Sequence, residues 1–279
     1  MMKEAFAFIN GVNICYEIYG DGDPVLLVHG FGAKKESWIA QISPLSKHFK
    51  VIRFDNRGAG KSDRPDGPYT MEIFADDINS LLDHLEIEKT HIIGWSLGGM
   101  IVQNFILKYP QRINKMVLIN TNYGIPDESG AETYKNMRLQ NLKLSKEDPV
   151  KTFWQSIRAD YHFKFRKQME VEPTKKWYGL WSADDLIQES IIDPPTEKDI
   201  IVQAKALATH HTFDRLHEIK NETLLITSTH DRVTPQSVME QMHEKISNST
   251  LKVIDKAGHG SPRSRAPEIN QMIIEFLKK

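Results

Sequence analysis

Short apolar runs alternate with amphipathic stretches along most of the 279-residue chain. Apolar-rich segments at residues 5–9 and 12–19 flank Asn10-Gly11, a dipeptide typical of tight turns, and this arrangement predicts an antiparallel hairpin. Continuous apolar runs farther along are typical of strands buried on both faces of a sheet. We expect such strands at residues 25–28, 51–54, 91–94, 115–120, 223–227 and 251–254.

Amphipathic segments with apolar residues at helical spacing separate these runs. One carries Trp38, Ile42 and Leu45 on a single face, and others cover residues 71–85, 97–109 and 267–278. Strands that alternate with helices in this way are typical of a parallel sheet. The pattern therefore predicts an α/β fold with a mostly parallel central sheet, an antiparallel hairpin at the N-terminal end and helices on both faces.

The alternation stops between about residue 123 and residue 215, where the chain becomes helical and aromatic and is interrupted by Pro194-Pro195. We interpret this segment as several helices inserted between two strands. The core would then comprise residues 1–122 and 216–279, and a helical cap would comprise residues 123–215. Most aromatic side chains of the cap are expected to form its own small core. A cap can also supply apolar walls to a substrate pocket, and we expect Trp154 to line such a pocket.

The composition argues against two classes of partner. The 36 lysines and arginines nearly balance the 37 aspartates and glutamates, and no long run of like charge favours nucleic acid or an anionic membrane. No apolar run reaches the length of a membrane span, and the first ten residues lack the pattern of a signal peptide. We therefore expect a cytoplasmic protein, monomeric or homodimeric. The single cysteine, Cys15, is interpreted as a small core residue rather than a nucleophile.

The motif that bears most on chemistry is Gly-x-Ser-x-Gly, formed by Gly94, Ser96 and Gly98 between an apolar run and a helical segment. In a sharp strand-to-helix turn this pattern lifts the serine hydroxyl clear of the sheet, and side chains at the two glycine positions would collide. The helix that follows points its N-terminus at Ser96, where its dipole favours developing negative charge. Ser96 is therefore the candidate nucleophile.

Two residues near the C-terminus are candidate partners of this serine. A serine hydroxyl needs a base to accept its proton as it attacks, and histidine can accept and return that proton near neutral pH. A carboxylate fixes the tautomer of the histidine ring. Asp231 and His259 follow the ends of two successive predicted strands. Because the carboxyl ends of parallel strands meet at one edge of a sheet, we expect both residues near Ser96.

The loop after the first buried strand, His29-Gly30-Phe31-Gly32, lies at the same predicted edge. Its glycines are expected to free the backbone N–H of Phe31 to face the site. His29 itself is interpreted as a buried residue that braces the turn.

Two other motifs point towards cofactors, but their residues do not support them. Residues 60–62, Gly-Lys-Ser, imitate the end of a phosphate-binding loop, but Asp55 stands where that motif requires its first glycine. We expect Asp55 and Arg57 to form a buried ion pair or to brace a turn. His210-His211 lacks carboxylate or cysteine partners at ligand spacing and is interpreted as helix surface. No cofactor and no metal is expected.

The chain resembles the α/β-hydrolase superfamily over essentially its whole length. Ser96, Asp231 and His259 follow in the order expected for that superfamily. The resemblance implies an oxyanion hole formed by the backbone N–H groups of Phe31 and Leu97. The matching segments are residues 29–32, 55–58 with Gly60 and Ser62, 94–99, 231–235 and 258–259.

The turn that carries Ser96 is called the nucleophile elbow in this superfamily. Haloalkane dehalogenases and epoxide hydrolases resemble this fold but have aspartate at that position, so Ser96 argues against both. Residues 95–99 resemble the elbow of pimeloyl-carrier-protein methyl ester esterases, and the neighbouring blocks resemble 3-oxoadipate enol-lactonases. We therefore expect a cofactor-independent serine hydrolase that cleaves a small or medium carboxylic ester, thioester or lactone through an acyl-enzyme. Trp95 and Phe31 are expected to line the acyl pocket.

Two alternatives to this function stay open at the level of sequence. The first is a carbon–carbon bond hydrolase of ring-cleavage products, which resembles this fold and has a similar helical cap. The second is a ligand sensor that retains the three candidate catalytic residues and signals through the cap.

Overall fold

The computed structural model describes residues 4–124 and 128–279. Within these residues one eight-stranded sheet has the strand order β1-β2-β4-β3-β5-β6-β7-β8. The pairs β1–β2 and β2–β4 are antiparallel, and all other neighbouring strands are parallel. The strands are β1 (Ala5–Ile9), β2 (Val12–Tyr19), β3 (Pro24–Val28), β4 (Lys50–Phe54), β5 (Thr90–Trp95), β6 (Ile113–Ile119), β7 (Thr223–Ser228) and β8 (Ser249–Ile254).

The helices fall into a set that covers the sheet and a set inserted between β6 and β7. The first set is α1 (Ile39–Leu45), α2 (Met71–His84), α3 (Leu97–Lys108), α9 (Gln236–Lys245), α10 (Ser261–Ser264) and α11 (Ala266–Lys278). The inserted set is α4 (Glu128–Glu147), α5 (Pro149–Ser156), α6 (Phe163–Val171), α7 (Ala183–Ile191) and α8 (Glu197–Ala208). Short 3₁₀ helices are η1 (Lys35–Trp38), η2 (Pro110–Arg112) and η3 (Phe213–Glu218).

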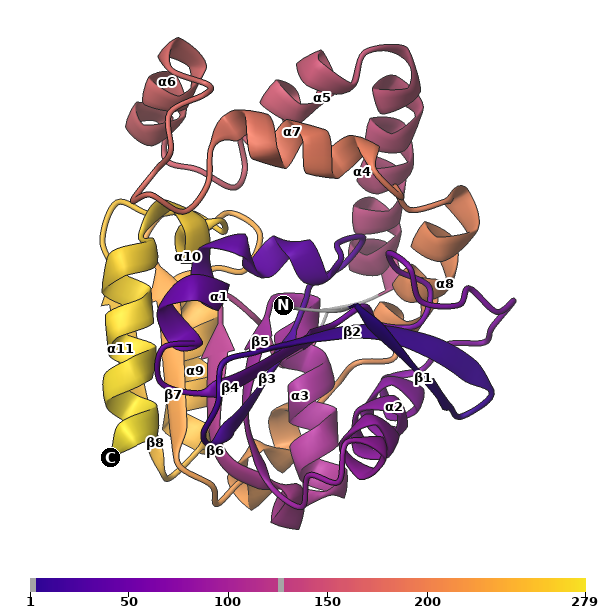
Figure 1. Ribbon diagram of the computed structural model, residues 1–279, viewed down its shortest axis with the longest axis vertical. Helices are drawn as coiled ribbons and strands as arrows, with labels where there is room; N and C mark the ends of the chain where they lie inside the picture. Colours follow the sequence, from indigo (N-terminus) through magenta and orange to yellow (C-terminus); the bar gives the residue numbers. More distant parts are fainter. Residues whose placement is uncertain (1–3, 125–127) are drawn as a thin grey trace.

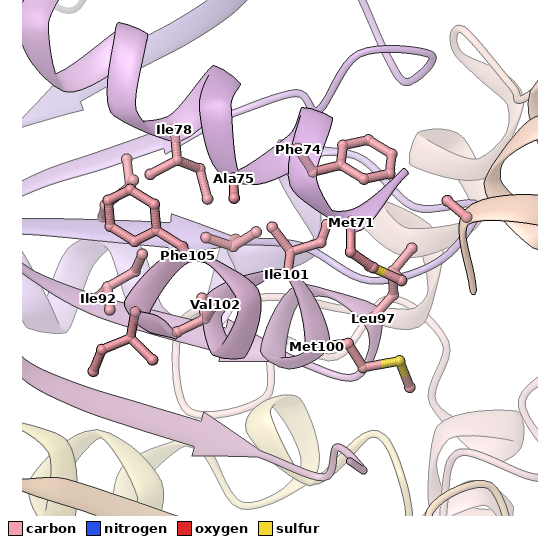
Figure 2. Close-up of a cluster of buried hydrophobic side chains, with 14 of the residues drawn as sticks. Met71, Phe74, Ala75, Ile78, Ile92, Leu97, Met100, Ile101, Val102 and Phe105 are labelled. Atoms are coloured by element: carbon pink, nitrogen blue, oxygen red, sulfur yellow. The ribbon is translucent and has the colours of Figure 1, made fainter. Parts of the chain in front are cut away.

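Successive side chains of a strand point to opposite faces of the sheet. Helices cover both faces, so the two sets of side chains lie in different apolar clusters. In β5, Ile92 belongs to the apolar cluster that contains α2, α3 and α9, whereas Ile93 belongs to the cluster that contains α1 and α11. Figure 2 shows the first cluster, in which Phe74 and Ile78 of α2 lie opposite the apolar side chains of α3. Burying one such side chain contributes about 1.5–3 kcal/mol, so these layers hold β5 and its C-terminal turn firmly.

In Figure 1 the inserted helices α5, α6 and α7 lie at the top, beyond the sheet, whereas α4 runs down toward the body and α8 lies lower, at the right. The inserted segment contains a cluster of its own, built on Met169 of α6 and on Trp177 and Trp181 between α6 and α7, and this cluster also includes Ala40 and Ala266 of the body. In addition, Leu142 of α4 and several side chains of α8 join the large cluster of the body. The inserted helices therefore pack on the rest of the molecule at two separate places.

The sequence predicted the fold class correctly, including the N-terminal hairpin and the layers of helices. Asn10 and Gly11 both have positive φ, 46° and 74°, as a two-residue hairpin turn requires. Helices α9 and α10 were not predicted from the sequence. In addition, η3 runs across the predicted boundary between residues 215 and 216. The division into core and cap stays a prediction.

Candidate active site

Ser96 occupies a sharp turn between the end of β5 and the start of α3. Its backbone has φ 57° and ψ −125°, a conformation that costs about 1–3 kcal/mol for a residue other than glycine. A Cβ atom on Gly98 would lie 2.0 Å from the carbonyl oxygen of Val28, and one on Gly94 would lie 2.5 Å from that of Gly98. The predicted steric reason for both glycines is confirmed.

The loop after β3 lies directly beside this turn. A Cβ atom added to Gly30 would lie 3.3 Å from the Cβ atom and 3.7 Å from the hydroxyl oxygen of Ser96. Phe31 follows Gly30 in this loop, and Leu97 is the first residue of α3. Within the described part of the chain, neither the N–H of Phe31 nor that of Leu97 donates a hydrogen bond. Two backbone donors close to Ser96 are thus left for other acceptors.

Asp231 and His259 lie in the loops after β7 and β8, as their positions in the sequence predicted. Nδ1 of His259 and Oδ2 of Asp231 are 2.8 Å apart, and both side chains are buried. The carboxylate of Asp231 also accepts hydrogen bonds from the N–H groups of Val233 and Thr234 and from the Thr234 hydroxyl. Both oxygens of the Asp231 carboxylate therefore accept hydrogen bonds, and these bonds fix the orientation of the carboxylate.

The two groups of this pair influence each other's titration. Burial alone would lower the pKa of His259, but the charge and hydrogen bond of Asp231 outweigh burial and raise this pKa above its usual value. Burial alone would raise the pKa of Asp231, but His259 and the donors from Thr234 lower it instead. The geometry therefore favours an ionised carboxylate beside a histidine that binds a proton more readily than in water.

The backbone of His259 is held next to the serine turn by two side chains. Nε1 of Trp95 donates to the carbonyl oxygen of His259 over 3.1 Å, and Nδ2 of Asn120 donates to the same oxygen over 2.9 Å. The ring centroids of Trp95 and His259 are 6.0 Å apart. Trp95 immediately precedes Ser96, so the serine turn and the histidine loop are physically connected.

Sequence reasoning gave no role to Asn120 and Thr234, although both hold members of this group. Asn120 has φ 42° and is fully buried at the end of β6. The position of an amide directly after a buried strand was a usable signal for Asn120. Thr234, three residues after Asp231, could have been identified as a side chain that bonds back to a preceding carboxylate.

The chain matches the model of the alpha/beta hydrolase fold family over residues 23–262. It belongs to this family. The 2-hydroxy-6-oxo-6-phenylhexa-2,4-dienoate hydrolase of Comamonas testosteroni is 28% identical over 277 residues, which cover 95% of this chain and 91% of that protein. The family assignment makes the protein a hydrolase.

Solved structures of other α/β-hydrolases agree with this assignment. A thermophilic esterase from Thermogutta terrifontis, with malate bound, is 26% identical and superposes with a TM-score of 0.82 over 99% of this chain and 98% of that chain. The enol-lactonase of Burkholderia xenovorans LB400 shares the fold, with 23% identity and a TM-score of 0.81 over 99% and 100% of the two chains. The resemblance to esterases and enol-lactonases is thereby supported at the level of fold.

His29, in the loop after β3, has a structural role, as predicted. Nε2 of His29 accepts a hydrogen bond from the N–H of Asn56, and Nδ1 lies 3.0 Å from the carbonyl oxygen of Gly30. Burial lowers the pKa of His29. The ring is therefore a neutral brace between two loops.

The predicted ion pair between Asp55 and Arg57 was wrong. Arg57 instead forms a bidentate pair with Asp77 of α2, with two N···O distances of 2.6 Å. Asp55 pairs with Lys35, accepts from the backbone N–H groups of Lys35 and Lys61, and so braces its turn as the alternative prediction required. Both carboxylates are buried, which explains why each has a cationic partner.

The surroundings of His210, His211 and Cys15 were also predicted from the sequence. His210 is buried rather than on a helix surface, because its ring packs against Asn104 and the carbonyl oxygen of Asn122, and burial lowers its pKa to about 4. His211 is exposed. Cys15 is buried, and burial raises its pKa to about 12, so its thiol is unreactive at neutral pH as predicted.

The residues predicted to line a substrate pocket lie in different surroundings. Phe31 is buried, with the guanidinium of Arg138 5.9 Å from its ring centroid. Trp95 packs between the rings of Trp38 and His259. Trp154 is half-buried on α5, with its ring centroid 5.2 Å from that of Phe153. Their contact with a substrate stays a prediction.

The described residues contain neither a membrane-spanning helix nor a metal-binding group of side chains. No helix there is long and apolar enough to cross a membrane. In the same part of the chain, no three or more His, Cys, Asp or Glu side chains are grouped so that they could hold a metal ion.

Proposed function

We propose that this α/β-hydrolase is a cofactor-independent serine hydrolase that cleaves a small or medium carboxylic ester, thioester or lactone. The observation that carries the proposal is the 2.8 Å contact between His259 and Asp231, in which the backbone of the histidine is hydrogen-bonded to Trp95, the residue before Ser96. A nucleophile, a base and a group that orients the base are the parts that acyl transfer requires. Membership of the family supports the assignment of a hydrolase.

In the first step, His259 acts as the base. Because its Nδ1 faces Asp231, a proton on Nδ1 leaves Nε2 free to accept the proton of the Ser96 hydroxyl. The Ser96 oxygen then attacks the carbonyl carbon, and the negative charge develops on the former carbonyl oxygen. The N–H groups of Phe31 and Leu97 would stabilise this charge, each contributing about 3–4 kcal/mol to the transition state.

The intermediate collapses when His259 donates its proton to the leaving oxygen or sulfur, and an acyl-Ser96 remains. Water then attacks the acyl group while His259 accepts a proton from it. The second intermediate expels the Ser96 oxygen, which regains its proton from His259. The product is a carboxylic acid, and Asp231 stabilises the charged ring in both halves of the cycle.

We also propose that residues 123–215 act as the cap of this site. Helices α4–α8 lie between β6 and β7 in the chain, and a cap over the carboxyl ends of the strands would exclude water and shape the acyl pocket. Phe31, Trp95 and Trp154 are proposed as pocket residues. The enzyme would act on a small-molecule substrate.

A second candidate function is the hydrolysis of carbon–carbon bonds in ring-cleavage products. It is favoured by the 28% identity to a Comamonas testosteroni enzyme named for such a substrate. The same serine and histidine would serve both reactions. Higher turnover on vinylogous diketones than on simple esters would favour this candidate over an esterase.

The test is a panel of 4-nitrophenyl esters of increasing chain length, assayed with the native protein and with Ser96→Ala. We expect multiple turnovers by the native protein and a loss of about 10³-fold or more in the variant. A fluorophosphonate probe should add one label, located on Ser96 by peptide mass spectrometry. Unchanged ester turnover in Ser96→Ala would end the proposal, and very slow turnover by the native protein would favour a sensor instead.

A further inference from the structure

The loop that presents His259 has a glycine on each side of the histidine. Gly260 has φ −80°, and the φ of Gly258 also lies outside the left-handed region that favours glycine. Backbone conformation therefore does not require glycine at either position. The requirement comes from the part of the chain that packs against the loop.

The segment that connects α5 to α6 fills the space that the two missing side chains leave. A Cβ atom on Gly258 would lie 2.6 Å from the carbonyl oxygen of Asp160, and one on Gly260 would lie 2.5 Å from Cε1 of Tyr161. The N–H of Gly260 also donates a hydrogen bond of 2.8 Å to the same carbonyl oxygen of Asp160. Two residues of the inserted segment are thus seated directly on the loop of the proposed base.

Asp160 and Tyr161 are themselves held firmly. Their N–H groups both donate to the carbonyl oxygen of Ile157, over 3.1 and 3.0 Å. The ring of Tyr161 is buried and stacks on that of Trp181, with the two ring planes inclined by 17°. The contact with the histidine loop therefore lies between two closely packed structures, and a shift of one would displace the other.

The next residue of the connection, His162, contacts the loop of Asp231. Its ring centroid lies 5.0 Å from that of His230, which directly precedes Asp231. Burial and the neighbouring His230 lower the pKa of His162. Residues 160–162 therefore lie against both loops that carry the proposed charge pair.

Asp160 brings a second carboxylate to the surroundings of His259. Its side chain is half-buried and forms no hydrogen bond or ion pair with any described residue. Burial lowers the pKa of His259, Asp231 and then Asp160 raise it, and Arg138 of α4 lowers it. From α10, the guanidinium of Arg263 lies 5.2 Å from the centroid of the indole ring that packs on His259. Asp160 therefore acts on the histidine and has no counter-charge of its own among these residues.

We propose that Asp160 and Tyr161 are positioning residues of the reaction. The carbonyl oxygen of Asp160 and the ring of Tyr161 fix the loop of His259, and the Asp160 carboxylate stabilises the positive charge that this ring acquires when it accepts the Ser96 proton. This inference rests on the proposed serine hydrolase function. It makes the connection between α5 and α6 a part of the active site, because the charge of the histidine develops between Asp231 and a carboxylate of the inserted segment.

The first experiment replaces the carboxylate by an amide of the same shape, in Asp160→Asn. Since His259 must be neutral to act as a base, loss of a nearby negative charge should move the acid limb of kcat/KM to lower pH. We expect a shift of about 0.5 pH unit on 4-nitrophenyl butyrate, and kcat at the alkaline plateau about threefold lower with little change in KM. Added NaCl should reduce the difference between the two proteins.

The matched control is Asp184→Asn. Asp184 is another half-buried carboxylate of the inserted segment, in the first turn of α7, and its side chain likewise has no hydrogen bond or ion pair among the described residues. This variant should keep the native midpoint. A native midpoint in Asp160→Asn, or equal shifts in the two variants, would overturn the role of the Asp160 carboxylate. The midpoint of a pH profile is independent of the fraction folded.

The second experiment tests the steric fit with a double-mutant cycle. Gly260→Ala places a methyl group against the ring of Tyr161 and should lower kcat about tenfold or more, with a smaller change in KM. Because leucine lacks the Cε1 atom, the same change in a Tyr161→Leu background should cost several-fold less. Each kcat refers to sites titrated with a fluorophosphonate probe, so unfolded protein is not counted. Equal losses in the two backgrounds would overturn the role of Tyr161.

The inference and the proposed function fail in different ways. If Ser96→Ala abolishes hydrolysis but Asp160→Asn keeps the native midpoint and the two Gly260→Ala losses are equal, the positioning roles are wrong and the serine hydrolase stands. If Ser96→Ala leaves hydrolysis unchanged, the proposed function itself is wrong.

Discussion

The indole N–H of Trp95 donates a hydrogen bond of 3.1 Å to the backbone carbonyl oxygen of His259. Trp95 is the last residue of β5, so this bond links the strand that presents Ser96 to the loop that presents the histidine. Asn120, from the end of the neighbouring strand, holds the same carbonyl oxygen. The position of the histidine therefore depends on side chains that need not touch the substrate.

We expect Trp95→Phe to lower kcat for 4-nitrophenyl esters about tenfold, because a smaller aromatic ring remains but the donor that positions His259 is lost. KM should change less. The free energy of unfolding should fall by about 1 kcal/mol, which is typical of one hydrogen bond. Steady-state kinetics and urea unfolding measure both quantities.

A matched control for this variant is Trp177→Phe. Trp177 is also buried, but its indole nitrogen has no hydrogen-bond partner among the described residues. Its replacement should leave kcat within about twofold of native, since no bond to the histidine loop is involved. Equal losses of kcat in the two variants would contradict a positioning role for Trp95.

The pH dependence of kcat/KM should report the charge of Asp231 on His259. His259 must be neutral to act as a base, so activity rises with pH through its pKa. Because Asp231 raises that pKa, the acid limb should have its midpoint above 6.5. In Asp231→Asn burial is opposed less strongly, and the midpoint of the residual activity should move to lower pH. A shift to higher pH would contradict this assignment.

The same pair makes opposite contributions to the pH dependence of stability. The pKa of His259 is raised on folding, so its contribution is full at low pH and is lost as pH rises through the raised pKa. The pKa of Asp231 is lowered, so its contribution is present at neutral pH and is lost on acidification. Asp231→Asn removes both contributions, so the difference in urea midpoint between native protein and this variant should be largest between the two pKa values and should fall at lower and at higher pH.

Gly98→Ala should destabilise the protein severely, because the new methyl group would lie 2.0 Å from the carbonyl oxygen of Val28 and neither backbone can move freely. We expect a loss of about 3 kcal/mol or more in the free energy of unfolding. Gly11→Ala is the control, since it has positive φ but no atom within 4 Å of the added methyl. That variant should lose only about 1 kcal/mol.

Asp77→Asn should lower the free energy of unfolding by about 3–5 kcal/mol, because it leaves the buried guanidinium of Arg57 without a counter-charge. Asp83→Asn removes a carboxylate from the same helix, where it pairs with Arg112 at the surface. An exposed pair of this kind is worth about 0–1 kcal/mol. Similar losses in the two variants would show that the Arg57 pair is effectively solvated.

The parts of the fold that the sequence predicted well are those decided by local patterns. Asn10-Gly11 determines the hairpin turn through its positive φ angles, and the apolar runs determine which strands are buried on both faces. The elbow at Ser96 was also predictable, since its two glycines satisfy a steric requirement contained within five residues.

Pairings between distant segments were not predictable in the same way. Arg57 bonds to Asp77 rather than to Asp55 because the loop after β4 meets α2, a fact that periodicity along the chain does not contain. Helix α9 was missed because its buried side chains, Met239 and Met242, are few among polar neighbours. The hydrogen bond from Asn120 to the backbone of His259 was not predictable for the same reason, because the two residues are 139 positions apart in the sequence.

The apolar cluster of the inserted helices includes Ala40 and Ala266, while Leu142 and α8 belong to the main cluster of the body. Separation of α4–α8 from the sheet as one rigid piece would therefore expose apolar surface at both attachments. Heat or urea should accordingly unfold the protein in a single cooperative transition rather than in two. The predicted boundaries at residues 122 and 215 then mark where the inserted segment begins and ends in the sequence. They do not separate two parts that fold independently.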